Sequence, residues 1–66
     1  MTKQEAIEEM KKGAKLKHRL FTSNEWITMQ GNLTIITEEG YRCPIGQFWF
    51  YRQGQEWDLD WYIFEE

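Results

Sequence analysis

The sequence has a single cysteine, a single histidine and a single proline among its 66 residues. One cysteine excludes an intramolecular disulfide, and a structural zinc site usually needs four cysteine or histidine ligands. No apolar run approaches the roughly 18 residues of a membrane span, so we expect no membrane partner. The net charge of -3 argues against a nucleic acid as the main partner. The polar N-terminal stretch is unlike a signal peptide, which predicts a cytoplasmic protein.

Aromatic residues, by contrast, are abundant. Phe, Trp and Tyr make up 17% of the chain, and four of them are tryptophans. A domain of this size buries only about 60% of the surface of its unfolded chain, so it has little room for a large aromatic core. We therefore predict a single domain over residues 1–66 that associates with itself, with some aromatic side chains at the interface or at a ligand.

The N-terminal segment carries the signals of a short helix. Thr2 and Glu5 have the spacing of a capping box, and Gly13 is a natural residue to follow the last turn. Ala6 and Met10 lie four apart and provide an apolar stripe. The sequence therefore predicts a helix over residues 3–12.

The remaining chain has the two-residue period of strands. Residues 14–20 alternate between an apolar face and a basic face of Lys15, Lys17 and Arg19. Residues 25–29 and 33–37 are predicted to form a hairpin. Residues 47–52 are predicted to form a strand that is apolar on both faces. Residues 57–64 are predicted to form the last strand, with a turn near residues 58–60. Residues 41–46 are expected to be irregular, because Pro44 and Gly46 disfavour a central strand. These elements predict an α+β fold with one N-terminal helix packed on a small, mostly antiparallel sheet of four or five strands.

Catalytic signals are weak. A dyad of His18 and Cys43 lacks a recognisable nucleophile signature, and Asp58 with Asp60 is more typical of a solvated acidic run than of acid–base catalysis. The glycines do not form a phosphate-binding loop. We expect no enzymatic activity, no cofactor and no metal site.

Binding is better supported by the sequence. Lysine and arginine side chains on one strand face suit phosphate groups, and neighbouring aromatic rings stack on bases. The candidates are Lys15, Lys17 and Arg19, with Phe21 and Trp26 close by in the sequence. A domain this small makes a poor pocket alone, so a site between two copies is favoured.

The order of these motifs resembles that of the small phage-encoded proteins of the Thoeris anti-defence family, the second type of phage cyclic-nucleotide sponge. The resemblance covers the whole length and rests on short motifs in a fixed order. In this sequence they are Glu5-Ala6-Ile7, Lys12-Gly13, the basic stretch 15–19 and Asp60-Trp61-Tyr62-Ile63. The chain departs from the family at Phe21, where members usually have tryptophan, and in its short, aromatic-rich segment before the last motif.

The resemblance implies a phage-encoded protein that sequesters a nucleotide signal of the cyclic ADP-ribose type without cleaving it, as a homo-oligomer in the cytoplasm of the host cell. Carried onto this chain, it places Arg19 at a phosphate and Phe21 and Trp26 at the base or ribose. It places Asp60 and Trp61 at the completion of the pocket. Packing in the core is an equally good interpretation of Trp61, and a turn is one of Asp60.

Two other functions stay open on the sequence. Five acidic residues and no base lie between residues 56 and 66, which suits a protein-binding inhibitor of a bacterial defence nuclease, of the anti-CRISPR type. A small self-assembling structural module, in which every aromatic side chain belongs to the core or an interface, is the third hypothesis. The basic run and the acidic run are also typical of solvated surface without a binding role.

Overall fold

The computed structural model describes residues 1–65 and begins with the expected helix. Helix α1 spans Lys3–Lys11. Thr2 accepts a hydrogen bond from the Glu5 backbone N–H, and the Glu5 carboxylate accepts one from the Thr2 N–H. The capping box predicted from the sequence is thus confirmed, and it satisfies two N–H groups that a helix start leaves unpaired.

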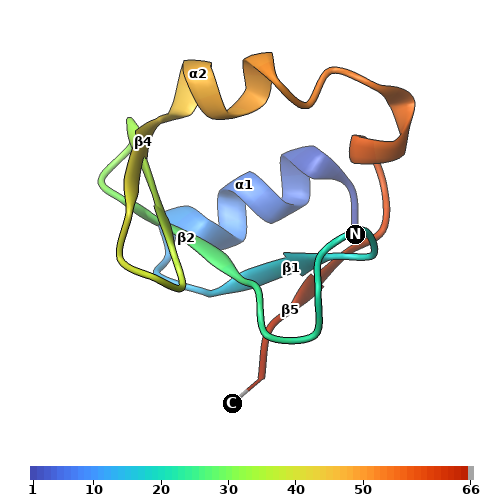
Figure 1. Cartoon of the computed structure of the whole chain (residues 1–66), viewed down its shortest axis with the longest axis horizontal. Helices are drawn as coiled ribbons and strands as arrows, with labels where there is room; N and C mark the ends of the chain where they lie inside the picture. Colours follow the sequence, from blue (N-terminus) through green and yellow to red (C-terminus); the bar gives the residue numbers. More distant parts are fainter. Residues whose placement is uncertain (66) are drawn as a thin grey trace.

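A five-stranded antiparallel sheet follows, in the order β4-β3-β2-β1-β5. Its strands are β1 (Leu16–His18), β2 (Ile27–Gln30), β3 (Thr34–Thr37), β4 (Arg42–Pro44) and β5 (Trp61–Ile63). The first and last strands of the chain are neighbours, so β5 pairs with β1 after crossing the molecule (Figure 1). The predicted α+β fold of one N-terminal helix on a small antiparallel sheet is confirmed.

The predicted hairpin joins β2 to β3. Ile27 pairs with Thr37, and Gln30 pairs with Thr34. Gly31 in the connection has a φ of 67°, a left-handed conformation that a residue without Cβ adopts without strain.

Two sequence predictions for residues 41–52 are wrong. The segment expected to be irregular contains β4, which tolerates Pro44 because it lies at an edge of the sheet. The segment expected to be a strand forms the helix α2 (Ile45–Phe50). A helix buries Phe48 and half-buries Trp49 while leaving Phe50 exposed, whereas a strand would need cover on both of its faces.

The last segment also differs in detail from its prediction. A 3₁₀ turn, η1 (Gln55–Trp57), replaces the first residues of the expected strand, and β5 begins only at Trp61. The turn anticipated near residues 58–60 is present. Asp60, within it, has a φ of 68° and is the one non-glycine residue with positive φ in residues 1–65.

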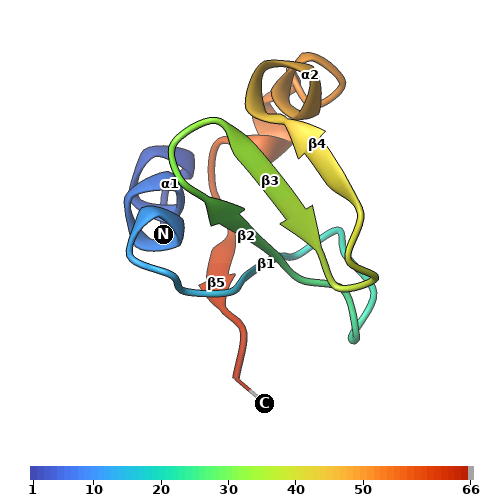
Figure 2. The ribbon, with the colours of Figure 1, turned by 90° about the vertical axis from the view of Figure 1, so that its left-hand side faces the viewer.

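The core lies between the sheet and the two helices, and Figure 2 shows this arrangement with α1 seen nearly end-on. Both helices contribute to it, as do all strands except β4, whose Cys43 only packs against it. Its buried members are Ala6, Met10, Leu16, Ile27, Met29, Ile35, Phe48 and Trp61. None of the described helices is long and apolar enough to cross a membrane.

Candidate functional site

The sheet has one face that no helix covers. Leu16 and His18 of β1 are buried toward α1, so the residues that alternate with them point to the other side. We call this uncovered side the open face. The basic and aromatic side chains on this face, in or next to β1, β2 and β5, are Lys15, Lys17, Arg19, Trp26, Tyr62 and Phe64.

At one end of the open face, a lysine lies over an aromatic pair. The Lys15 Nζ is 4.5 Å from the centre of the Trp26 ring, and the Trp26 and Phe64 rings are 6.2 Å apart. Phe64 is held there because its backbone N–H donates to the Lys15 carbonyl over 2.8 Å. A cation over an indole face is a favourable electrostatic contact, and it keeps both groups in place.

In the middle of the open face, Lys17 lies directly opposite Tyr62 across the β1–β5 ladder. The Tyr62 side chain is 46% exposed, so its ring is available to a planar ligand. Cross-strand neighbours on one face have their Cβ atoms about 5 Å apart, which puts an ammonium group within reach of any anion that rests on the tyrosine.

At the far end, Arg19 and Asp60 form an ion pair. The Arg19 Nε donates to the Asp60 Oδ2 over 3.0 Å, and the Arg19 backbone N–H donates to the Asp60 carbonyl over 3.1 Å. Both side chains are about half exposed. An arginine has five N–H donors, so this contact leaves the two Nη groups for a phosphate.

Trp61 and Phe21 lie elsewhere. Trp61 is fully buried, and its indole N–H donates to the Trp57 carbonyl over 2.8 Å. Phe21 packs edge-on against it, with ring centres 5.8 Å apart. Trp61 therefore belongs to the core, which is the alternative that the sequence left open.

The six residues singled out by the sequence are thus only partly brought together. Arg19 meets Asp60, and Lys17 lies on the same face, whereas Trp26 packs with Phe64 rather than with Phe21. A single pocket holding Phe21, Trp26 and Trp61 is not formed within one chain. The sheet separates these side chains, because Trp61 points to the α1 side and Trp26 points to the open face.

Sequence reasoning missed the part of Tyr62 and Phe64 in this surface. The signal was present in the alternation of the last strand, where Trp61 and Ile63 occupy the other face. In a strand, successive side chains point to opposite faces, so the side chains on one face determine which side chains lie on the other.

His18 is held by backbone groups on both ring nitrogens. Its Nδ1 accepts the Leu20 backbone N–H over 3.0 Å, so Nε2 carries the proton and donates to the Leu59 carbonyl over 2.8 Å. Cys43 lies on β4, and the two strands β3 and β2 lie between β4 and β1 in the sheet. The two residues therefore form no dyad, and His18 instead joins the turn after β1 to the turn before β5.

Arg52 is a cation of a different kind, because it is part of the packing. Its guanidinium lies 4.0 Å from the Phe48 ring centre and 5.5 Å from that of Trp57, and its Nη1 donates to the Phe48 carbonyl. Desolvation by burial lowers the pKa of Arg52, while the charges of Cys43 and Glu25 raise it. The side chain fastens α2 to η1 and is not part of the open face.

A shallow cavity of about 330 Å³ lies along α1. Its lining residues are Met1, Gln4, Glu5, Glu8 and Glu9. None of the described residues of the open face is among these lining residues, so the cavity is separate from that face.

Comparisons with known proteins add no relative. No family model matches the sequence, and no curated protein or solved structure matches it either. Functional inference for this chain therefore depends on its own residues.

Proposed function

We propose that this chain is a binding protein that sequesters an anionic nucleotide signal, of the cyclic ADP-ribose type, on its open face without cleaving it. The proposal extends to the setting that the sequence resemblance implies, a phage-encoded anti-defence protein acting in the host cytoplasm. The supporting motifs are, in order, Glu5-Ala6-Ile7, Lys12-Gly13, the basic stretch 15–19 and Asp60-Trp61-Tyr62-Ile63.

One observation carries the proposal: the open face has a row of cations with aromatic rings beside it. The cations are every second residue from 15 to 19, in and next to β1, and the aromatic side chains lie in or next to β2 and β5. Phosphates prefer the ammonium and guanidinium groups, and a purine ring stacks on an exposed aromatic face. A nucleotide with two phosphates and a base has anionic groups for the cations of the open face and a planar ring for its aromatic side chains.

A second copy of the chain completes the site in this proposal. The open face is a surface, and tight binding of a small ligand normally requires burial of most of its own surface. Two such faces repel each other by their like charges, and an anionic ligand between them removes that repulsion. The ligand would thus be enclosed between two open faces.

Calorimetric titration tests the proposal with cyclic ADP-ribose isomers and cyclic dinucleotides as probes. We expect a binding isotherm with at least one of them, and chromatography of the released ligand should recover it intact. Analytical ultracentrifugation should show two copies in the complex. Absence of heat with every probe, together with no small molecule released on heating the purified protein, would contradict the function.

Matched variants locate the binding surface. Lys17→Gln should weaken binding about tenfold, the effect of losing a hydrogen bond to a charged group. Tyr62→Ala should weaken it about fivefold or more through lost stacking. Lys12→Gln and Tyr51→Ala are the controls, because both positions are exposed and directly follow the helices α1 and α2. Equal losses in the controls would place the ligand elsewhere.

A further inference from the structure

Within residues 1–65, the outward backbone groups of Ile63 on the outer edge of β5 have no hydrogen-bond partner. On its inner side β5 is bonded to β1, as shown by the hydrogen bonds of Asp60 and Phe64 with Arg19 and Lys15. In an antiparallel strand the groups of alternate residues point in opposite directions, so those of Trp61 and Ile63 point away from β1. Trp61 uses them, because its N–H and C=O pair with the C=O and N–H of Met1 over 3.2 and 2.8 Å. Ile63 is the next position along this edge.

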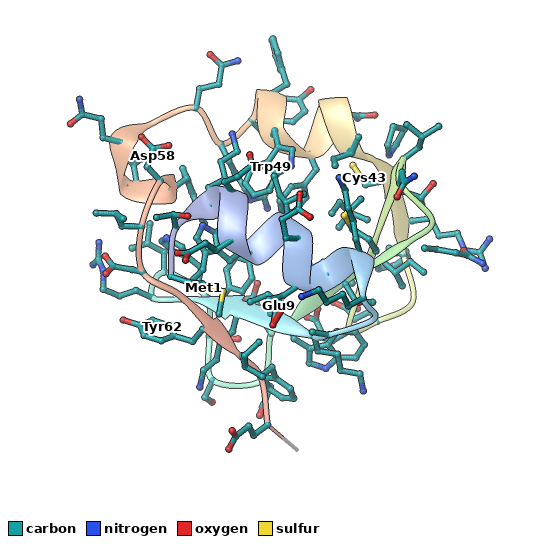
Figure 3. All side chains as sticks on the ribbon, turned by 180° about the vertical axis from the view of Figure 1, so that it is seen from behind. Met1, Glu9, Cys43, Trp49, Asp58 and Tyr62 are labelled. Carbon is teal, nitrogen blue, oxygen red and sulfur yellow. The ribbon has the colours of Figure 1, made fainter. Side chains whose placement is uncertain are left out.

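The edge at Ile63 adjoins the α1 cavity. Ile63 pairs with the buried Leu16, so its side chain lies on the α1 side, and it is 39% exposed. Met1, which is bonded to β5, also lines the cavity together with Glu5, Glu8 and Glu9. In Figure 3, Met1 and Glu9 lie on one flank of β5 and Tyr62 on the other. No residue of β5 is among the lining residues of the cavity, so we use the word groove for the α1 cavity together with the neighbouring β5 edge, which Met1 connects to it.

The charge of this groove is negative. Its lining includes three carboxylates, and the cation among the lining residues is the N-terminal ammonium of Met1, which donates to the Trp61 carbonyl over 2.8 Å. Glu8 and Glu9 do pair with Lys11 and Lys12 at 3.7 and 3.1 Å, but these ion pairs are exposed. Exposed pairs of this kind contribute little to stability, so an arriving cation can replace them.

We infer that this groove binds an extended basic segment of a partner protein, which pairs with Ile63 as an added strand. Its backbone extends the line that Met1 begins on the edge of β5, and its lysine or arginine side chains meet Glu9 and its neighbours on α1. Main-chain pairing provides the affinity in such strand additions, and the alternate side chains provide the specificity. The groove is separate from the open face, so this interaction does not depend on nucleotide binding.

Amide hydrogen exchange by NMR, with acetyl-Lys-Val-Lys-Val-Lys-amide as the probe, tests the inference. We expect exchange at the Ile63 amide to slow about tenfold when the peptide is added. A peptide with both valines replaced by proline has the same charge but poor pairing geometry, and it should give no protection. The peptide with glutamate in place of lysine should not bind.

Variants distinguish the groove from general electrostatic attraction. Glu9→Gln should weaken peptide binding about threefold, as expected for one exposed ion pair, whereas Glu39→Gln, in the turn after β3, should not change it. Protection at Tyr62 and Lys17 instead of Ile63 would overturn the inference, and so would equal binding of the proline peptide. Protection of Ile63 that depends on protein concentration without peptide would also overturn it, in favour of pairing between copies.

Discussion

The Arg19 guanidinium is held by the Asp60 carboxylate, with 3.0 Å between Nε and Oδ2, although 41 residues separate the two in sequence. The same residues are joined through the backbone, from the Arg19 N–H to the Asp60 carbonyl. Asp60 occupies a left-handed conformation at a φ of 68°. One residue thus ends the turn before β5 and orients a cation at the end of the open face.

Substitutions at Asp60 separate its conformational role from its charge. Asp60→Asn should change the free energy of unfolding by at most about 1 kcal/mol, because asparagine tolerates positive φ and the lost ion pair is exposed. Asp60→Val should cost about 1–3 kcal/mol, since a β-branched residue is strained at this φ. Urea unfolding followed by circular dichroism measures both. Similar losses in the two variants would mean that charge, not backbone conformation, dominates at this position.

Trp61 and Trp26 should respond in opposite ways to truncation. Trp61→Ala removes a fully buried side chain and should cost about 3–5 kcal/mol, which is enough to unfold a domain of this size. Trp26→Ala removes a half-buried ring from the open face and should leave the protein folded, with weaker binding of the nucleotide probe. Near-ultraviolet circular dichroism reports the folding of both variants. A folded Trp61→Ala protein that has lost only ligand binding would assign Trp61 to the site rather than the core.

The sequence predicts the local elements that have their own signals. The capping box at Thr2 and Glu5, the hairpin at Gly31 and the two faces of β1 are all present as predicted. The sequence-based prediction fails at residues 45–50. The consecutive aromatic side chains there fit neither the two-residue period of a strand nor the period of an amphipathic helix, and the burial of Phe48 against the core favours the helix. The pairing of β5 with β1 depends on contacts between residues more than 40 positions apart, which no local pattern encodes.

The same limit applies to the candidate site. Lys17 and Arg19 are assigned to the open face by alternation within one strand. Tyr62 and Phe64 join them only because β5 returns to the side of β1. A site built across a long-range strand pair can therefore be predicted from the sequence on one of its strands but not on the other.

The capping box makes the stability of α1 depend on pH. Hydrogen bonds from the backbone and side chain of Thr2 lower the pKa of Glu5 below its usual value. Because the folded-state pKa is the lower one, the stabilisation is present above the unfolded-state pKa of about 4.5 and is lost as the pH falls through the folded-state value. Thermal unfolding of the wild type and Glu5→Gln should therefore differ at pH 6 and converge once the pH is below the lowered, folded-state pKa of Glu5. Glu38→Gln, outside α1, is the control, and a difference that persists at low pH would mean that the charge of Glu5 is not its cause.

His18 should prove to be a structural connector between two turns. His18→Phe keeps a ring among the neighbouring Trp57 and Trp61 rings but leaves the Leu20 N–H and the Leu59 carbonyl without their partner. We expect a loss of about 2 kcal/mol in the free energy of unfolding. His18→Asn retains an acceptor near the position of Nδ1, so amide exchange at Leu20 should remain slow in this variant and become fast in His18→Phe. Equal exchange at Leu20 in both variants would show that the imidazole contributes through ring packing alone.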